Sequence, residues 1–138
     1  MNWVNKFPKR GISVPQDYEM HICQLKIEIK PYKADEFVKS MRSFSRRIRK
    51  EKGCLSYNVY RDHENEDTFS LVGEWKTRQA MDKHFQTRDF EVLIVAARVL
   101  GETFAMNIAE VMKTGGFELA KKQIASQKGR SAGEFCHD

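Results

Sequence analysis

Residues 53–75 read GCLSYNVYRDHENEDTFSLVGEW, and they contain two runs of β-forming residues separated by a polar connection. The runs extend from about Cys54 to Arg61 and from Thr68 to Trp75, and they predict two antiparallel strands joined as a hairpin. Side chains alternate between the two faces of a strand, so every second residue of the later run shares one face. The residues of that face are Phe69, Leu71, Gly73 and Trp75.

A strand and a helix are predicted before the hairpin. Apolar residues alternate from His21 to Ile29, which is the pattern of a half-buried strand, and Pro31 stops this strand. An apolar stripe at helical spacing then begins at Phe37, so a helix is expected to run to near Gly53.

Two short helices and a last strand are predicted after the hairpin. Thr77 and Thr87 are suitable N-caps for the two helices, and Gly101 should end the second one. Apolar residues alternate again from roughly Thr103 to Lys113, which indicates a strand that the following glycine pair ends.

The predicted order is β-α-β-β-α-β, with the second helical region split. This order is typical of the α+β ferredoxin-like fold, an antiparallel sheet with helices on one face. We expect one such domain at residues 19–113, an irregular arm at residues 1–18, and an extension at residues 114–138 that is either a short helix or a frayed end. The open sheet face needs a cover, and a second copy of the chain is the natural one.

Composition excludes several classes of protein. Hydrophobic residues make up 41% and charged residues 31% of the chain, which is typical of a globular domain. No apolar run approaches the roughly 20 residues that span a bilayer, and the first residues do not resemble a secretory signal, so no membrane partner and a cytoplasmic location are expected. Cys23, Cys54 and Cys136 lack the spacing of a disulfide framework or a zinc ribbon.

Much of the net charge of +5 lies in residues 32–52, where eight basic residues accompany three acidic ones. Such a segment is either a docking face for nucleic acid, a membrane surface or an anionic ligand, or the solvated side of an amphipathic helix. The solvated side is the favoured interpretation, because an apolar stripe occupies the complementary positions. RNA binding is not expected, because the strand from Thr68 to Trp75 has aromatic residues only near its ends.

The chain contains no glycine-rich phosphate loop, no dinucleotide-binding fingerprint and no nucleophile elbow. Its four histidines are far apart in the sequence, and His21 and Cys23 on one strand face are too few to bind a metal. Neither a metal site nor a cofactor is therefore expected.

The remaining candidate is a site of a few polar groups in an apolar pocket between the sheet and the helices. Trp75 supplies a flat surface and one N–H donor, and His84 lies on the helix side that should meet the sheet, although both residues also suit a packed core. An unperturbed histidine pKa near 6.5 would make His84 a proton acceptor at cellular pH. Gly73 leaves space beside Trp75, either for a ligand ring or for the close approach of a helix. Further candidates for substrate binding are Tyr57, Asn58, Phe69, Leu71 and Phe90, of which Tyr57 and Asn58 point to opposite faces.

Three features occur in a fixed order: Gly53-Cys54-Leu55-Ser56-Tyr57, then Glu74-Trp75, and then His84, nine residues after the tryptophan. This order resembles the antibiotic biosynthesis monooxygenase (ABM) domain family, and the resemblance covers roughly Glu19 to Lys113. It implies a dimeric α/β barrel in which two sheets pack face to face, and therefore a homodimer through the open sheet face.

The resemblance also implies an enzyme that needs neither flavin nor metal. Triplet dioxygen cannot take an electron pair directly from a closed-shell molecule, but a deprotonated quinol, anthrone or similar aromatic can pass it one electron. The implied function is a monooxygenase whose partners are a small aromatic substrate and dioxygen. His84 would be the base, and Trp75 with Tyr57 or Asn58 would donate to the developing oxyanion.

Alternatives on the same scaffold stay open, because a fold does not determine a reaction. One is an isomerase of a phosphorylated signalling sugar, and another is a non-catalytic dimeric module for ligand binding or stress. A narrow pocket, or a His84 that is buried and fully hydrogen-bonded, would favour the module. Haem-degrading relatives carry an axial histidine in the second short helix, where this chain has Leu93, Ile94 and Val95, so haem breakdown is not expected.

Overall fold

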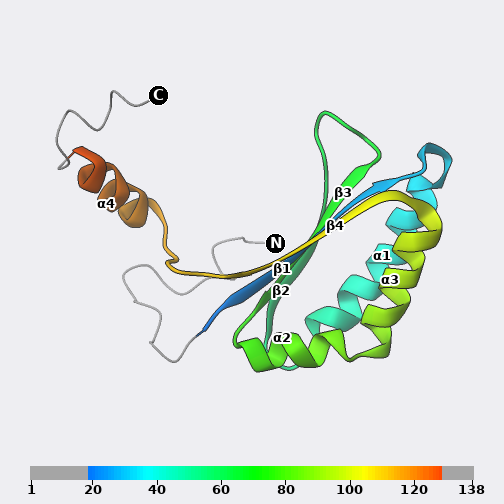
Figure 1. Ribbon diagram of the computed structural model, residues 1–138, viewed down its shortest axis with the longest axis horizontal. Helices are drawn as coiled ribbons and strands as arrows, with labels where there is room; N and C mark the ends of the chain where they lie inside the picture. Colours follow the sequence, from blue (N-terminus) through cyan, green and yellow to red (C-terminus); the bar gives the residue numbers. More distant parts are fainter. Residues whose placement is uncertain (1–18, 129–138) are drawn as a thin grey trace. The chain divides into compact units, whose positions relative to one another are not determined.

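The computed structural model of the protein describes residues 19–128, in which an antiparallel sheet of four strands carries helices on one face (Figure 1). Contacts within the chain separate a unit of residues 16–111, which contains the sheet, from a second unit that contains the C-terminal helix. The arm predicted for residues 1–18 lies outside the described residues. The elements in chain order are β1 His21–Ile29, η2 Pro31–Lys33, α1 Ala34–Arg49, β2 Cys54–Arg61, β3 Thr68–Trp75, α2 Arg78–Phe85, α3 Arg88–Leu100, β4 Gly101–Glu110 and α4 Phe117–Lys128.

The strands are arranged in the order β2-β3-β1-β4, and every neighbouring pair is antiparallel. The central strand β1 pairs with β3, where Leu25 lies opposite Leu71, and with β4, where Leu25 lies opposite Met106. The structure therefore confirms the predicted α+β ferredoxin-like order of elements.

The hairpin and the two helix starts form where the sequence predicts them. β2 and β3 have the predicted bounds, and the polar connection joins them. The Oγ1 atoms of Thr77 and Thr87 accept hydrogen bonds of 3.1 Å from the backbone N–H groups of Ala80 and Phe90, as N-cap side chains do.

The last strand differs from the prediction in its bounds. It runs from Gly101 to Glu110, whereas the sequence suggested roughly Thr103 to Lys113. Its length follows its partner β1, because Gly101 lies opposite Ile29 and Glu110 lies opposite His21. β4 therefore ends where its partner β1 ends, and Gly115 and Gly116 do not terminate it.

The core lies between the sheet and helices α1, α2 and α3. On β1 and β3, every second residue is buried, which matches the alternation that the sequence shows. The largest fully buried side chains are Trp75, Phe37, Phe69, Leu25, Ile27, Ile29, Ile48, Leu71, Met81 and Leu93.

β4 carries a row of exposed apolar side chains, here called the β4 row: Phe104, Met106 and Ile108. These residues lie opposite Ile27, Leu25 and Cys23, whose side chains point into the core. The β4 row therefore extends the helix-covered face of the sheet beyond the helices. The exposed fractions of the three residues, 46%, 37% and 53%, leave an apolar edge for another molecule to cover.

The C-terminal helix α4 has no buried residue, and its apolar side chains Phe117 and Ile124 are 89% and 56% exposed. Among residues 19–128, no helix combines the length and the apolar character that a membrane span requires.

Candidate functional site

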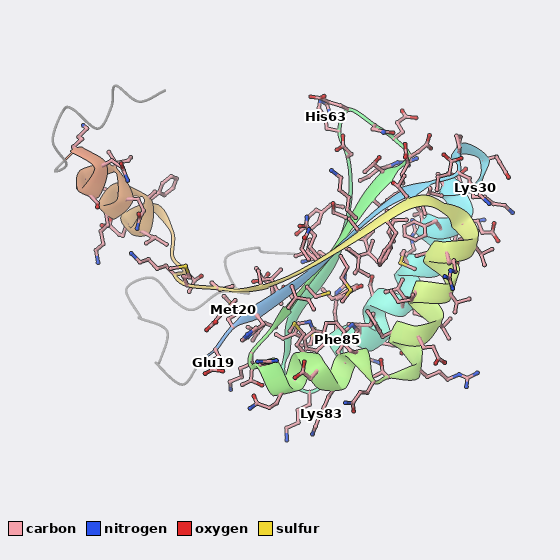
Figure 2. All side chains as sticks on the ribbon, viewed as in Figure 1. Glu19, Met20, Lys30, His63, Lys83 and Phe85 are labelled. Carbon is pink, nitrogen blue, oxygen red and sulfur yellow. The ribbon has the colours of Figure 1, made fainter. Side chains whose placement is uncertain are left out.

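His84 lies in the last turn of α2 and is only 2% exposed. Its imidazole stacks on the indole of Trp75, with ring centroids 4.6 Å apart and planes inclined by 28°. The rings of Phe90, Phe85 and Tyr57 complete the surroundings, with centroids 5.2, 5.8 and 6.2 Å from that of His84. We call these four rings the aromatic cage, and Figure 2 labels Phe85 at the end of α2.

The polar partner of His84 is Glu51, whose Oε1 atom lies 3.0 Å from the imidazole Nδ1. The turn after α1 explains why these residues meet. Gly53 has a φ of +83°, which favours glycine, and a Cβ there would lie 2.5 Å from the Cβ of Ala80 in α2. The turn therefore packs directly against α2 and brings Glu51 to His84.

Burial dominates the electrostatics of this pair. It lowers the pKa of His84 to about 4, although the carboxylate of Asp89 acts in the opposite direction. Burial also raises the pKa of Glu51 to about 7, and Asp89 adds to that rise. At neutral pH the imidazole is therefore uncharged, so the contact is a hydrogen bond and not an ion pair, while Glu51 is close to half ionised.

The indole Nε1 of Trp75 is buried and has no hydrogen-bond partner among the described residues. A buried donor without an acceptor costs roughly 1–3 kcal/mol, so such a group in a folded protein needs an explanation. The space expected beside Gly73 is filled by the protein itself. A Cβ at Gly73 would lie 3.0 Å from Trp75 Nε1 and 3.0 Å from Tyr57 Cδ2.

The phenol of Tyr57 is buried, and its pKa is raised, first by burial and then by Cys23, Cys54 and Glu51. It therefore keeps its proton throughout the physiological range. Burial also raises the pKa of the free thiols, to about 11 for Cys23 and about 12 for Cys54. Neither cysteine has the lowered pKa of a nucleophilic thiol.

The candidate residues predicted from the sequence do not all lie together. Tyr57, Gly73, Trp75 and Phe90 surround His84, with Gly73 as the position over which two of the rings pack.

The other three candidates lie elsewhere. Leu71 is fully buried in the core, and Phe69, six residues before Trp75 on β3, is roughly 20 Å from it at strand spacing. Phe69 and Asn58 instead line a groove of about 510 Å³ beside α1, β2 and β3.

Sequence reasoning missed Glu51, which it counted only as one charge in a basic segment. The available signal was its position two residues before a glycine in a tight turn. That signal does not identify a partner 33 residues away. No group of three or more His, Cys, Asp or Glu residues within the described ranges could hold a metal ion.

A family model described as antibiotic biosynthesis monooxygenase matches residues 20–94. "Putative monooxygenase YcnE" of Bacillus subtilis is 30% identical over 81 residues, which are 59% of this chain and 85% of YcnE. "Uncharacterized protein sll1783" of Synechocystis is 37% identical over 68 residues, which are 49% of this chain and only 46% of that protein. A crystal structure of a conserved protein from Methanosarcina mazei is similar with a TM-score of 0.63 at 26% identity, covering 68% of this chain and 94% of that one.

Proposed function

The chain belongs to the antibiotic biosynthesis monooxygenase family, and we propose that it is a cofactor-independent monooxygenase of a quinol, anthrone or similar electron-rich aromatic. The observation that carries this proposal is the contact of 3.0 Å between Glu51 and His84 inside the aromatic cage. A carboxyl group on one imidazole nitrogen sets the protonation of the other nitrogen, which is the arrangement of a general base.

The protonation of Glu51 decides whether His84 can act as that base. When Glu51 is ionised, His84 Nδ1–H donates to it, and Nε2 keeps a lone pair that can accept the phenolic proton of the substrate. When Glu51 is protonated, it donates to Nδ1, and the neutral imidazole then carries its proton on Nε2. Because the pKa of Glu51 is raised to about 7, the active form should increase through neutral pH.

Deprotonation makes the substrate electron-rich enough to react with dioxygen. The substrate anion passes one electron to dioxygen, and the resulting substrate radical and superoxide combine to a peroxide anion. This anion takes back the proton that His84 accepted and becomes a hydroperoxide. Loss of water then leaves a carbonyl, so one oxygen atom enters the product and the other leaves as water. The unpaired Nε1–H of Trp75 supports this proposal, because it could donate to the oxyanion that develops on the substrate.

The cage is closed over His84, and the proposal therefore includes a movement of side chains. Phe85 and Phe90 are half-buried, whereas Trp75 is fully buried beneath the imidazole. Displacement of the two phenylalanine rings would admit a planar substrate to Nε2. Once closed again, the cage would exclude water from the oxygen-reactive anion.

A second candidate function is a non-catalytic dimeric module that binds a ligand or has a stress-related role. The burial of His84 and its hydrogen bond to Glu51 favour this candidate, because a histidine held in that way can be purely structural. The isomerase alternative has no specific support from the geometry.

We also propose that the chain acts as a homodimer. A second copy would cover the β4 row, whose side chains are exposed in the single chain, together with the face of the sheet that carries no helices. The cytoplasm is the proposed location, and no nucleic acid or membrane partner is part of the proposal.

Oxygen uptake tests the proposed function. We expect the protein to accelerate oxygen consumption with at least one member of a panel of reduced quinones and anthrones, relative to spontaneous oxidation. The rate should rise from about pH 6 to about pH 8, and His84→Gln should abolish it without changing the circular dichroism spectrum. An absence of acceleration across the panel would favour the ligand-binding module.

A further inference from the structure

A groove of about 510 Å³ lies beside α1 and the hairpin, away from His84. A volume of this size is in the range of sites for small organic ligands. Four of the residues around it are arginines, and none is acidic. The lining residues are Val38, Met41, Arg42, Ser45, Arg46, Arg49, Asn58, Val59, Arg61 and Phe69.

The positive charge of this arginine groove is not neutralised by neighbouring carboxylates. Arg42 and Arg46 stand one turn apart on α1, and neither forms an ion pair or a side-chain hydrogen bond with another described residue. Arg47, one position further along the helix, is different because its Nε donates to both carboxylate oxygens of Asp89 at 3.0 Å. The guanidinium groups of Arg42 and Arg46 are therefore available to a ligand in the groove.

The other two arginines are held in place by backbone carbonyls. Arg49 Nε donates to Tyr57 O at 2.9 Å, and Arg61 Nε donates to Glu66 O at 2.5 Å. The guanidinium carbon of Arg61 also lies 5.1 Å from the centroid of the Phe69 ring. These contacts use one nitrogen of each guanidinium and leave the remaining N–H donors for another acceptor.

The floor of the groove is apolar. Met41 and Phe69 are buried core residues, and Val38 and Val59 are half-buried beside them. The combination of an apolar floor and an arginine rim matches a ligand that has an apolar body and an oxyanion at one end.

We propose that the arginine groove binds a small amphipathic anion, an aromatic or alkyl carboxylate or sulfonate. Its apolar body lies on Met41, Val38 and Phe69, and its charged head lies against Arg42 and Arg46. Guanidinium groups recognise such heads with paired N–H donors, which a single ammonium group cannot supply. This site is separate from the proposed oxygenase site, because Phe69 and Trp75 lie near opposite ends of β3.

A fluorescent aromatic sulfonate, 1-anilinonaphthalene-8-sulfonate, is a direct probe of this proposal. We expect saturable binding to the full chain, competition by octanoate, and much weaker binding of the uncharged analogue N-phenyl-1-naphthylamine. The double variant Arg42→Gln/Arg46→Gln should bind the sulfonate about tenfold more weakly, since it loses the charged donors of the head group. Both side chains are exposed, so the variant should fold as the parent does.

Lys39→Gln is the matched control, because Lys39 is an exposed cation of the same helix that does not line the groove. It should change the affinity by less than about twofold, since an exposed cation that does not contact the head group contributes little in water. Equal binding by the double variant and the parent, or equal binding of the charged and uncharged probes, would overturn the proposal. So would binding to vesicles of phosphatidylserine and phosphatidylcholine without binding of octanoate, which would indicate a lipid surface instead.

Discussion

At the residue scale, burial shifts the pKa values of one imidazole and one carboxyl group in opposite directions. An isolated histidine would be half charged near pH 6.5, but desolvation in the aromatic cage makes the charged imidazole of His84 costly. The same desolvation makes the carboxylate of Glu51 costly. The two residues therefore share one hydrogen bond across neutral pH and do not form a permanent ion pair.

Opposite pH dependences of stability should follow for the two single variants. In the folded parent, the pKa of His84 is lowered, so its contribution to stability rises between about pH 4 and pH 6.5. The pKa of Glu51 is raised, so its contribution to stability falls between about pH 4.5 and pH 7. These slopes oppose each other in the parent. In Glu51→Gln, the free energy of unfolding should rise with pH by up to about 1.4 kcal/mol per pH unit. In His84→Gln, it should fall as the pH rises.

Urea denaturation at several pH values between 4.5 and 6.5 measures this directly. The parent should show little pH dependence from this pair. If Glu51→Gln and His84→Gln gave the same pH dependence as the parent, the two groups would not have the shifted pKa values on which the mechanism relies.

Trp75→Phe tests the indole N–H as the donor to the oxyanion. Phenylalanine retains an aromatic ring next to His84 but lacks the donor, so the oxygen-uptake rate should fall about a hundredfold. The change also removes buried volume, at a cost of about 1–3 kcal/mol in stability. Phe37→Leu is a suitable control, because it removes a buried ring elsewhere in the core and should leave the rate within about twofold of the parent. Similar rates in both variants would remove Trp75 from the mechanism.

At the scale of elements, the sequence predicts the regular parts well and the junctions less well. β2 and β3 have their predicted bounds because turn-forming residues flank both strands. The observed bounds of β4 differ from the predicted ones, because pairing with β1 sets the ends of this strand. The alternation of apolar residues within β4 does not reveal that pairing. Three of the cage residues, Trp75, Tyr57 and Phe90, are candidates in the sequence because they lie on faces expected to be buried, whereas Phe85 is not among those candidates. Glu51 could not be anticipated, because its contact depends on how the turn at Gly53 meets α2.

Gly53→Ala should show how much that turn contributes. The positive φ and the collision with the Ala80 side chain predict a loss of about 2–4 kcal/mol in the free energy of unfolding. Adding Ala80→Gly should restore only part of it, because the backbone strain remains. Gly116→Ala, which meets no atom within 4 Å, should be nearly neutral in urea denaturation. A stable Gly53→Ala protein would show that the turn tolerates other conformations.

At the scale of the whole molecule, exposed apolar surface and uncompensated charge indicate what the chain binds. The β4 row is an apolar edge without a cover in the single chain, and the arginine groove combines an apolar floor with positive charge. The sequence predicted the need for a cover on the open sheet face, but it did not show that the apolar row lies on the helix side of β4. The sequence places the arginines of α1 on a solvated side, and they are exposed in the structure. Helical spacing alone cannot reveal that some of them border a groove formed with distant strands.

Ile108→Glu should convert the proposed dimer to a monomer without unfolding it. Ile108 is 53% exposed in the single chain, so a carboxylate there costs little in the monomer but would be buried against a second copy. Light scattering after size-exclusion chromatography should give the mass of two chains for the parent and of one for the variant. Val99→Glu, at an exposed position of α3, should remain dimeric. A monomeric parent would contradict the proposed dimer.

In the proposed reaction, His84 with Glu51 activates an aromatic substrate for attack by dioxygen. The most direct measurement is mass spectrometry of the product formed under ¹⁸O₂ by the parent and by His84→Gln, with the anthrone or quinol that responds in the uptake assay. We expect one labelled oxygen atom per product molecule from the parent and only the protein-free background from the variant. Equal labelling by both proteins, or none above background from the parent, would contradict the proposed reaction.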